Sequence, residues 1–264
     1  MSSHSTQFEA TAGGLVLTSA ILLYKSGKHG TPRAGADAFA SIHDVEQRDS
    51  GPVIAAGTPL THAHLRQWTK ALGRAAVPEI LPANVLVAHT DLIAWWMPEQ
   101  VRTAYFALSS PPAGLKALSG RTTLPVPYPP HLFVATRGGL GVYALPVNER
   151  PVADTQLLHS PVLNVFLNGQ LCWGNIARPK ALTTAAIPEY ERALFESWST
   201  HPNPGQEHTL TGKGGLVRLW DDLAATGAKR FPVKRLKPFN PNSNRQALKV
   251  PVTLGSLIAE RTAA

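Results

Sequence analysis

The pattern of hydrophobic and polar positions predicts strands in the first part of the chain. Residues 15–24 (LVLTSAILLY) and 38–46 (AFASIHDVE) are rich in apolar side chains, and a polar, glycine-containing segment separates them. Runs of this kind, bounded by turn residues, are typical of strands. We therefore expect an opening β-hairpin or meander, within an N-terminal β extension that covers residues 1–58.

A helix is predicted next. Leu65, Trp68 and Leu72 recur at spacings of three and four residues, which places them on one stripe of a helix. Thr61 is a suitable N-cap, and a proline lies beyond the expected end. His62 and His64 are two residues apart, so they face different sides of this helix, and no carboxylate motif accompanies them. We expect no metal site here.

The middle of the chain returns to strand patterns, and the last third changes to helix patterns. Strands are predicted at residues 85–87, 92–96 and 102–106, followed by a proline-rich breaker zone at 109–130 and a hairpin with strands at 131–136 and 140–145. Apolar spacing predicts helices at 187–198 and 216–225. Strands followed by helices favour an α+β fold with an antiparallel sheet over an alternating βαβ fold.

The composition is that of a folded chain without a membrane segment. With 44% hydrophobic and 16% charged residues, the 264-residue chain can bury a sizeable core, unlike a disordered protein. The apolar run at 15–24 is too short to cross a bilayer, and no basic segment precedes it as in a secretory signal. We expect a cytoplasmic protein that does not contact a membrane.

The net charge of +8 is concentrated near the C-terminus. Residues 229–249 contain seven cations and no acid. We expect a basic, flexible tail over residues 228–264, which either aids solubility or attracts nucleic acid or an acidic protein face. The candidate nucleic-acid contacts are Lys229, Arg230, Lys234, Arg235 and Lys237.

Cys172 is the single cysteine, within the stretch NVFLNGQLCWGNI at residues 164–176. One cysteine excludes an internal disulfide and a cysteine-rich zinc site. Taken alone, a free cysteine is most often a small buried apolar group. The alternative is a nucleophile on an exposed, extended segment, because a thiol is a strong nucleophile already at neutral pH. A cysteine hydrolase is disfavoured, since no motif ties a histidine or aspartate to Cys172; proximity of His159, His131 or His201 to Cys172 in the fold would reverse this.

The surroundings of Cys172 resemble the ubiquitin-conjugating (UBC) enzyme family. Asn168-Gly169-Gln170-Leu171-Cys172 follows the family's Asn-Gly-x-Ile-Cys motif, Asn164 lies eight residues before the cysteine, and Pro127-Tyr128-Pro129-Pro130 approximates a proline-rich loop of the family. More narrowly, the chain is similar over most of its length to the protein B family of the PRTRC cassette, a plasmid-associated set of bacterial genes. The segments that carry this likeness are 95–98 (WWMP), 129–133 (PPHLF), 160–165 (SPVLNV), 169–174 (GQLCWG) and 195–203 (FESWSTHPN).

The resemblance implies a UBC-like fold over residues 59–227, an antiparallel meander flanked by helices. It implies that Cys172 accepts a ubiquitin-like modifier as a thioester and passes it to an amine, with Asn164 as the amide donor to the oxyanion. A ubiquitin-like protein and a ThiF-like activating enzyme are the implied partners, and no cofactor or metal is implied. The sequence departs from the family's His-Pro-Asn tripeptide, because Val162 and Leu163 precede Asn164; His159 is a nearby substitute for the histidine.

Other interpretations remain open. A catalytically inactive UBC-like adaptor would bind the modifier or DNA and would bury or occlude Cys172, and a plasmid-maintenance factor would act on DNA through the basic tail. Asn164 could cap backbone in a turn instead of assisting catalysis. His201-Pro202-Asn203 is a literal His-Pro-Asn tripeptide, but it begins 29 residues after Cys172, so it either lines the site or ends the preceding helix.

Overall fold

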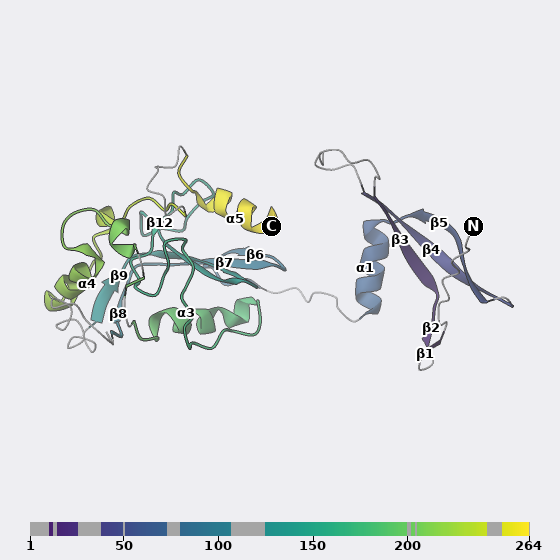
Figure 1. Cartoon of the computed structure of the whole chain (residues 1–264), viewed down its shortest axis with the longest axis horizontal. Helices are drawn as coiled ribbons and strands as arrows, with labels where there is room; N and C mark the ends of the chain where they lie inside the picture. The colour runs from purple at the N-terminus through teal and green to yellow at the C-terminus, as the bar shows by residue number, and fades with distance from the viewer. Residues whose placement is uncertain are drawn as a thin grey trace. The chain divides into compact units, whose positions relative to one another are not determined.

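The chain forms two compact units, Met1–Glu79 and Ile80–Ala264. The computed structural model describes residues 11–12, 15–25, 38–49, 51–72, 80–106, 125–199, 202–203, 205–241 and 250–263 (Figure 1). The division follows Glu79, whereas the expected boundary followed residue 58, so the helix predicted from Thr61 belongs to the first unit. No helix in these ranges is long and apolar enough to cross a bilayer.

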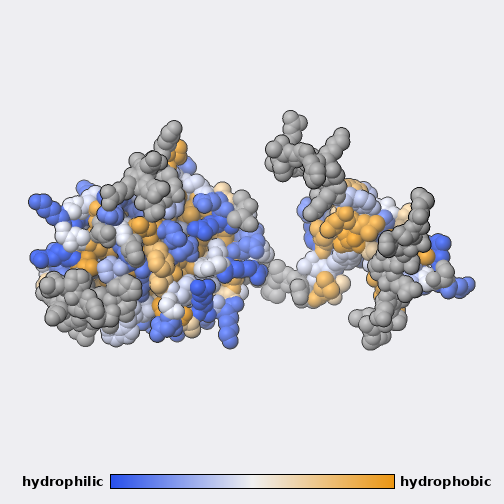
Figure 2. Space-filling model, in the orientation of Figure 1, coloured by the Kyte–Doolittle hydropathy of each residue, from blue (hydrophilic) through white to orange (hydrophobic). Residues whose placement is uncertain are grey.

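Antiparallel strands make up most of the described residues of the first unit. Strands β3 (Ser19–Lys25), β4 (Ala38–Arg48) and β5 (Gly51–Pro59) form a three-stranded sheet, and β1 (Thr11–Ala12) pairs with β2 (Leu15–Val16). Both predicted strands are present, and β5 adds a third. Several apolar side chains of this sheet are exposed, among them Leu23 and Phe39, and hydrophobic surface is visible on this unit in Figure 2.

Helix α1 (His62–Ala71) begins where the sequence predicts. The Thr61 hydroxyl accepts a hydrogen bond from the backbone N–H of His64, and the His64 ring accepts one from the backbone N–H of Thr61. This reciprocal arrangement is a capping box, which satisfies two N–H groups that a helix start otherwise leaves unpaired. His64 is therefore a capping residue. Among the described residues, no group of three or more His, Cys, Asp or Glu side chains could hold a metal ion.

A five-stranded antiparallel sheet organises the second unit. Its order is β12-β11-β10-β7-β6, so strands that follow one another are neighbours except where a separate pair, β8 with β9, intervenes. The strands are β6 (Val85–Ala88), β7 (Leu92–Met97), β8 (Gln100–Thr103), β9 (Pro125–Tyr128), β10 (His131–Thr136), β11 (Gly139–Ala144) and β12 (Leu158–His159). The predicted β10–β11 hairpin is confirmed, with Thr136 opposite Gly139.

The sheet is covered on both faces (Figure 1). Along β7, Trp95 packs into a larger core with helices α3 (Ile187–Phe195) and α4 (Gly215–Ala225), whereas Ala94 faces a smaller core with α5 (Leu254–Ala263). Successive strand residues point to opposite faces, which explains this division. Short 3₁₀ turns lie at Thr184–Ala186, Gln206–Thr209 and Val233–Arg235. An α+β unit with antiparallel sheets and few helices is compatible with a UBC-like fold.

The described part of the basic segment, residues 228–241, packs against the body of the second unit. Phe231 and Leu236 are buried in the larger core, and Phe239 is buried in the smaller one. The backbone N–H of Phe239 donates to the carbonyl of Leu157 at 2.8 Å. This differs from the expected flexible tail, because apolar residues between the cations supply enough buried surface to hold the backbone in place. Residues 242–249 lie outside the described ranges.

Candidate active site

The segment that carries Cys172 is a tight loop held against the edge of the sheet. Its turn is Asn168-Gly169, where the Asn168 side chain accepts a hydrogen bond from the backbone N–H of Gln170 and Gly169 has a φ of 80°. Glycine is needed there, since a Cβ would stand 2.5 Å from the Tyr143 ring. The backbone N–H of Leu171 donates to the Leu140 carbonyl of β11 at 2.8 Å. The segment Asn168–Cys172 therefore forms a loop whose position is fixed by its hydrogen bond to β11.

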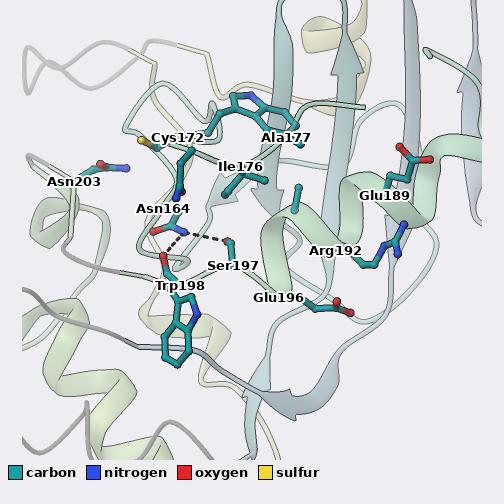
Figure 3. A pocket seen from close by; sticks show the side chains of 14 residues that line it. Asn164, Cys172, Ile176, Ala177, Glu189, Arg192, Glu196, Ser197, Trp198 and Asn203 are labelled. Carbon is teal, nitrogen blue, oxygen red and sulfur yellow. Dashed lines mark hydrogen bonds between the residues drawn. The ribbon is translucent and has the colours of Figure 1, made fainter. Parts of the chain in front are cut away.

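Cys172 is half-buried and faces a cavity. Its neighbours Leu171 and Trp173 are both buried in the larger core. Because side chains alternate in an extended segment, the cysteine between them points away from that core. The cavity has a volume of about 680 Å³ and is lined by Asn164, Cys172, Trp173, Gly174, Asn175, Ile176, Ala177, Glu189, Arg192, Ala193, Glu196, Ser197, Trp198 and Asn203 (Figure 3). Cys172 is thus less enclosed than Leu171 and Trp173 on either side of it.

Asn164 and Cys172 are neighbours in space, as the sequence spacing suggested. The backbone N–H of Cys172 donates to the Asn164 carbonyl at 2.6 Å. The Asn164 side-chain amide donates to the Ser197 hydroxyl at 3.3 Å and to the Trp198 carbonyl at 3.4 Å. Asn164 therefore links the cysteine loop to the segment that follows α3.

Helix α3 forms the wall of the cavity opposite the cysteine loop. Glu189, Arg192 and Glu196 follow one another at helical spacing and line the cavity from this side. On the cysteine side, the guanidinium of Arg178 lies 5.4 Å from the centre of the Trp173 ring, a cation–π contact. The cavity thus combines an apolar floor with charged groups of both signs.

The structure does not bring His159 into the cavity. It lies on β12, where its ring packs against Phe239 at 5.2 Å between ring centres and its Nε2 accepts a hydrogen bond from the backbone N–H of Asn240. Burial, assisted by the positive charge of Lys237, lowers the pKa of His159 to about 4. The side chain is therefore neutral at pH 7 and supports the fold at this position.

Another buried histidine sits behind the loop that leads to Asn164. Burial lowers the pKa of His131 to about 4. Its Nδ1 lies 2.6 Å from the Pro129 carbonyl and its Nε2 lies 3.3 Å from the Ser160 hydroxyl, so the tautomer with a proton on Nδ1 satisfies both contacts. The Ser160 hydroxyl in turn accepts from the backbone N–H of Val162. His131 is thus a structural support of the site.

Asn203 also lines the cavity, at the end near Cys172 (Figure 3). The sequence left open whether the His201-Pro202-Asn203 tripeptide lines the site or ends the helix. Asn203 lines the cavity. His201 lies outside the described residues. Spacing along the chain does not place Asn203 beside the cysteine. The only sequence signal was the tripeptide itself, whose residue types match a conjugating site but whose order relative to the cysteine is reversed.

The cations of the basic segment differ in whether their side chains already make contacts within the protein. Arg230 forms an ion pair with Glu99 at 3.2 Å, and Arg235 donates to the carbonyls of Thr211 and Lys213. Three exposed lysines remain as candidate contacts for an acidic partner, and we call them the surface lysines: Lys229, Lys234 and Lys237.

Comparison with known families decides the membership. A sequence model described as prokaryotic E2 family D matches residues 64–239, which is more than half of the chain. The chain belongs to prokaryotic E2 family D. Neither the curated proteins nor the solved structures gave a match. The prokaryotic E2 match continues beyond residue 227, so it includes Phe231, Leu236 and Phe239 of the packed basic segment.

Membership in prokaryotic E2 family D supports a UBC-like role in ubiquitin-like conjugation. It also implies, in general terms, partnership with a modifier and an activating enzyme. Val162 and Leu163, which stand where the UBC motif has histidine and proline, are both buried in the larger core. In this protein the backbone that leads to Asn164 is held by the apolar packing of these two residues.

Proposed function

We propose that this prokaryotic E2 protein carries a ubiquitin-like modifier as a thioester on Cys172 and transfers it to an amine. The observation that supports this most directly is the position of Cys172, half-buried at the edge of a cavity of about 680 Å³ and held on a fixed loop. A carrier thiol needs access for a bulky acyl donor and a defined position, and little other machinery.

The proposed reaction has two steps. The Cys172 thiolate attacks the carbonyl carbon of a thioester on the activating enzyme; a new C–S bond forms, and the thiolate of the activating enzyme leaves. An amine then attacks the same carbon, a C–N bond forms, the C–S bond to Cys172 breaks, and the amine proton passes to water. The products are an amide-linked modifier and a regenerated Cys172 thiolate.

The cavity offers features suited to each substrate. Trp173, Ile176 and Ala193 provide an apolar surface for an extended acyl chain. The carboxylates of Glu189 and Glu196 line the same cavity and can attract a lysine side chain by charge. In this proposal Asn164 either donates a hydrogen bond to the oxyanion or holds the loop after α3 in place.

The proposed setting follows from the resemblance to the PRTRC protein B family. The modifier and a ThiF-like activating enzyme would then come from the same plasmid-associated cassette, in the cytoplasm. Contact with nucleic acid would fall to the surface lysines, which belong to the same compact unit as Cys172.

An inactive adaptor is the competing interpretation, and it predicts a buried or occluded Cys172. The intermediate burial of Cys172 and its place in the cavity lining favour the carrier. A test by intact-mass measurement separates them. The protein is incubated with ATP, the activating enzyme and the modifier, and an adduct that disappears with thiol reductant is expected.

The single cysteine makes this experiment unambiguous. Because Cys172 is the only thiol in the chain, Cys172→Ala removes every site for a reducible adduct, whereas Cys172→Ser is expected to give an adduct that resists reductant. Modifier binding that is unaffected by Cys172→Ala, with no adduct on the wild-type protein, would establish the adaptor instead.

A further inference from the structure

Asn203 combines burial, a fixed backbone and an unused hydrogen-bond donor. Only 4% of its surface is exposed. Its side-chain nitrogen Nδ2 has no hydrogen-bond partner among the described residues, although it is itself buried. Leaving a buried donor unpaired costs on the order of 1–3 kcal/mol, and such groups in folded proteins generally have a reason to persist.

The backbone of Asn203 is tied to the loop that carries the other site residues. Its N–H donates to Oε1 of Gln206 at 2.7 Å, and Nε2 of the same Gln206 donates to the Val162 carbonyl at 2.8 Å. Gln206 is 1% exposed. Gly205 packs so closely on Leu167 that an added Cβ would stand 2.6 Å from it. Asn203 is therefore held in register with residues 162–172, even though it lies far along the chain.

The two asparagine amides of the cavity differ in availability. Both N–H groups of the Asn164 side chain have acceptors, at Ser197 and Trp198. In Figure 3 the Asn164 amide is turned toward these two residues, while the Asn203 amide and the Cys172 sulfur lie at the same end of the cavity. A catalytic donor must have no other acceptor when charge develops on the substrate, and Nδ2 of Asn203 has none among the described residues. Because Nδ2 is buried, the Asn203 side chain must turn toward the acyl group in order to donate.

We infer that Asn203 is the oxyanion donor of this site, and that Asn164 is a positioning residue that fixes the loop after α3. The inference rests on the proposed thioester chemistry of Cys172. When an amine attacks the acyl-Cys172 carbonyl carbon, the carbonyl oxygen becomes an oxyanion and accepts the hydrogen bond from Nδ2 of Asn203. The attacking nitrogen loses a proton to water, the C–S bond breaks, the oxygen becomes the carbonyl oxygen of a neutral amide, and the Cys172 thiolate is released.

A chemical probe tests this without knowledge of the natural modifier. Full-length protein is incubated with the mercaptoethanesulfonate thioester of N-acetyl-glycyl-glycine; the Cys172 thiolate attacks, mercaptoethanesulfonate leaves, and the acyl adduct is followed by intact mass. After removal of the excess probe, lysine is added, and the loss of the adduct is measured against the lysine concentration. The same acyl thioester of glutathione gives the rate without a protein site.

Asn203→Ala is expected to slow the transfer to lysine by about 10- to 100-fold, less than the largest losses seen in fully enclosed oxyanion holes because this site is partly open. The half-saturating lysine concentration should stay the same, since the oxyanion exists only in the transition state. Asn203→Asp, which keeps the size of the side chain but replaces the donor with a charge, should be at least as slow. Asn164→Ala, the matched control, is expected to retain more activity.

The outcomes separate the inference from the function on which it rests. If Cys172 takes up no acyl group, or if the wild-type adduct reacts no faster than the glutathione thioester, the proposed function fails. If the wild-type protein accelerates transfer and both Asn203 variants match it, or if Asn164→Ala causes the larger loss, the inference is overturned. Should Asn203→Ala unfold, as judged by circular dichroism, the Asn203→Asp variant decides the matter by the same comparison.

Discussion

Acid is expected to destabilise the second unit through its two buried histidines. His131 and His159 both have a pKa lowered from 6.5 to about 4 by burial. The folded state therefore holds them neutral, while the unfolded chain binds protons below pH 6.5. The stabilisation is fully present above pH 6.5 and is lost as the pH falls toward 4, because the unfolded state then binds more protons.

The size of the effect follows from the same pKa values. Between pH 7 and pH 5, a histidine that titrates near 6.5 when unfolded and near 4 when folded loses about 2 kcal/mol of stabilisation. The two histidines together predict a loss of about 4 kcal/mol, a large part of the stability of an ordinary domain. Protonation of His131 would also place a second N–H against Ser160, which supports the loop leading to Asn164.

Urea unfolding at pH 7, 6 and 5, followed by tryptophan fluorescence, measures this loss; the buried Trp95 and Trp220 of the second unit contribute to the signal. His131→Asn and His159→Asn are the matched variants. Each is expected to be less stable at pH 7 but to lose about 2 kcal/mol less than the wild-type protein on going to pH 5. A wild-type unfolding free energy that is the same at pH 7 and pH 5, or variants with the wild-type pH dependence, would refute the reasoning.

Three further predictions concern the loop, the basic segment and its charge. Gly169→Ala should destabilise the protein by about 2 kcal/mol or more, because φ is 80° there and the Tyr143 ring leaves no room for a Cβ; thermal unfolding checks this, and an unchanged Tm would contradict the geometry. Phe239→Ala should lower the free energy of unfolding in urea by about 3–5 kcal/mol. Lys237→Ala, a change at an exposed neighbour, should alter it by less than about 0.5 kcal/mol. An effect of Phe239→Ala as small as that of Lys237→Ala would show that the segment is not anchored. Any DNA binding through the surface lysines should weaken with salt, with a slope of about −3 in log K against log salt concentration, and filter binding that is insensitive to salt would exclude contact through phosphates.

Elements set by neighbouring residues were predictable from the sequence. Thr61 indicated the start of α1, although Leu65 and Leu72 of the predicted stripe are exposed. The pair Gly138-Gly139 between two apolar runs indicated the β10–β11 hairpin. The proline-rich zone was read only as a breaker, but residues 125–128 form β9, which pairs with β8 in a separate two-stranded sheet. A proline lacks the N–H needed by a central strand but is tolerated in such an outlying pair.

The features that the sequence did not reveal depend on contacts between distant parts of the chain. In the basic segment, the density of positive charge predicted a flexible tail. Phe231 and Phe239 are instead buried against the two cores of the second unit, which lie far away in the sequence. The same holds for Asn203, because its place in the cavity depends on the bridge that Gln206 makes to Val162. No local propensity or spacing encodes that bridge.

The packing of residues 231–239 and α5 also governs how this protein can be shortened. A fragment that stops at Gly227 would lack Phe239, Leu254 and Leu257 and would expose part of the smaller core, which also contains Leu92 and Leu132 of the sheet. Exposed apolar surface of this kind promotes self-association. Recombinant pieces of the second unit should therefore run from Ile80 through Ala263 if they are to stay monodisperse.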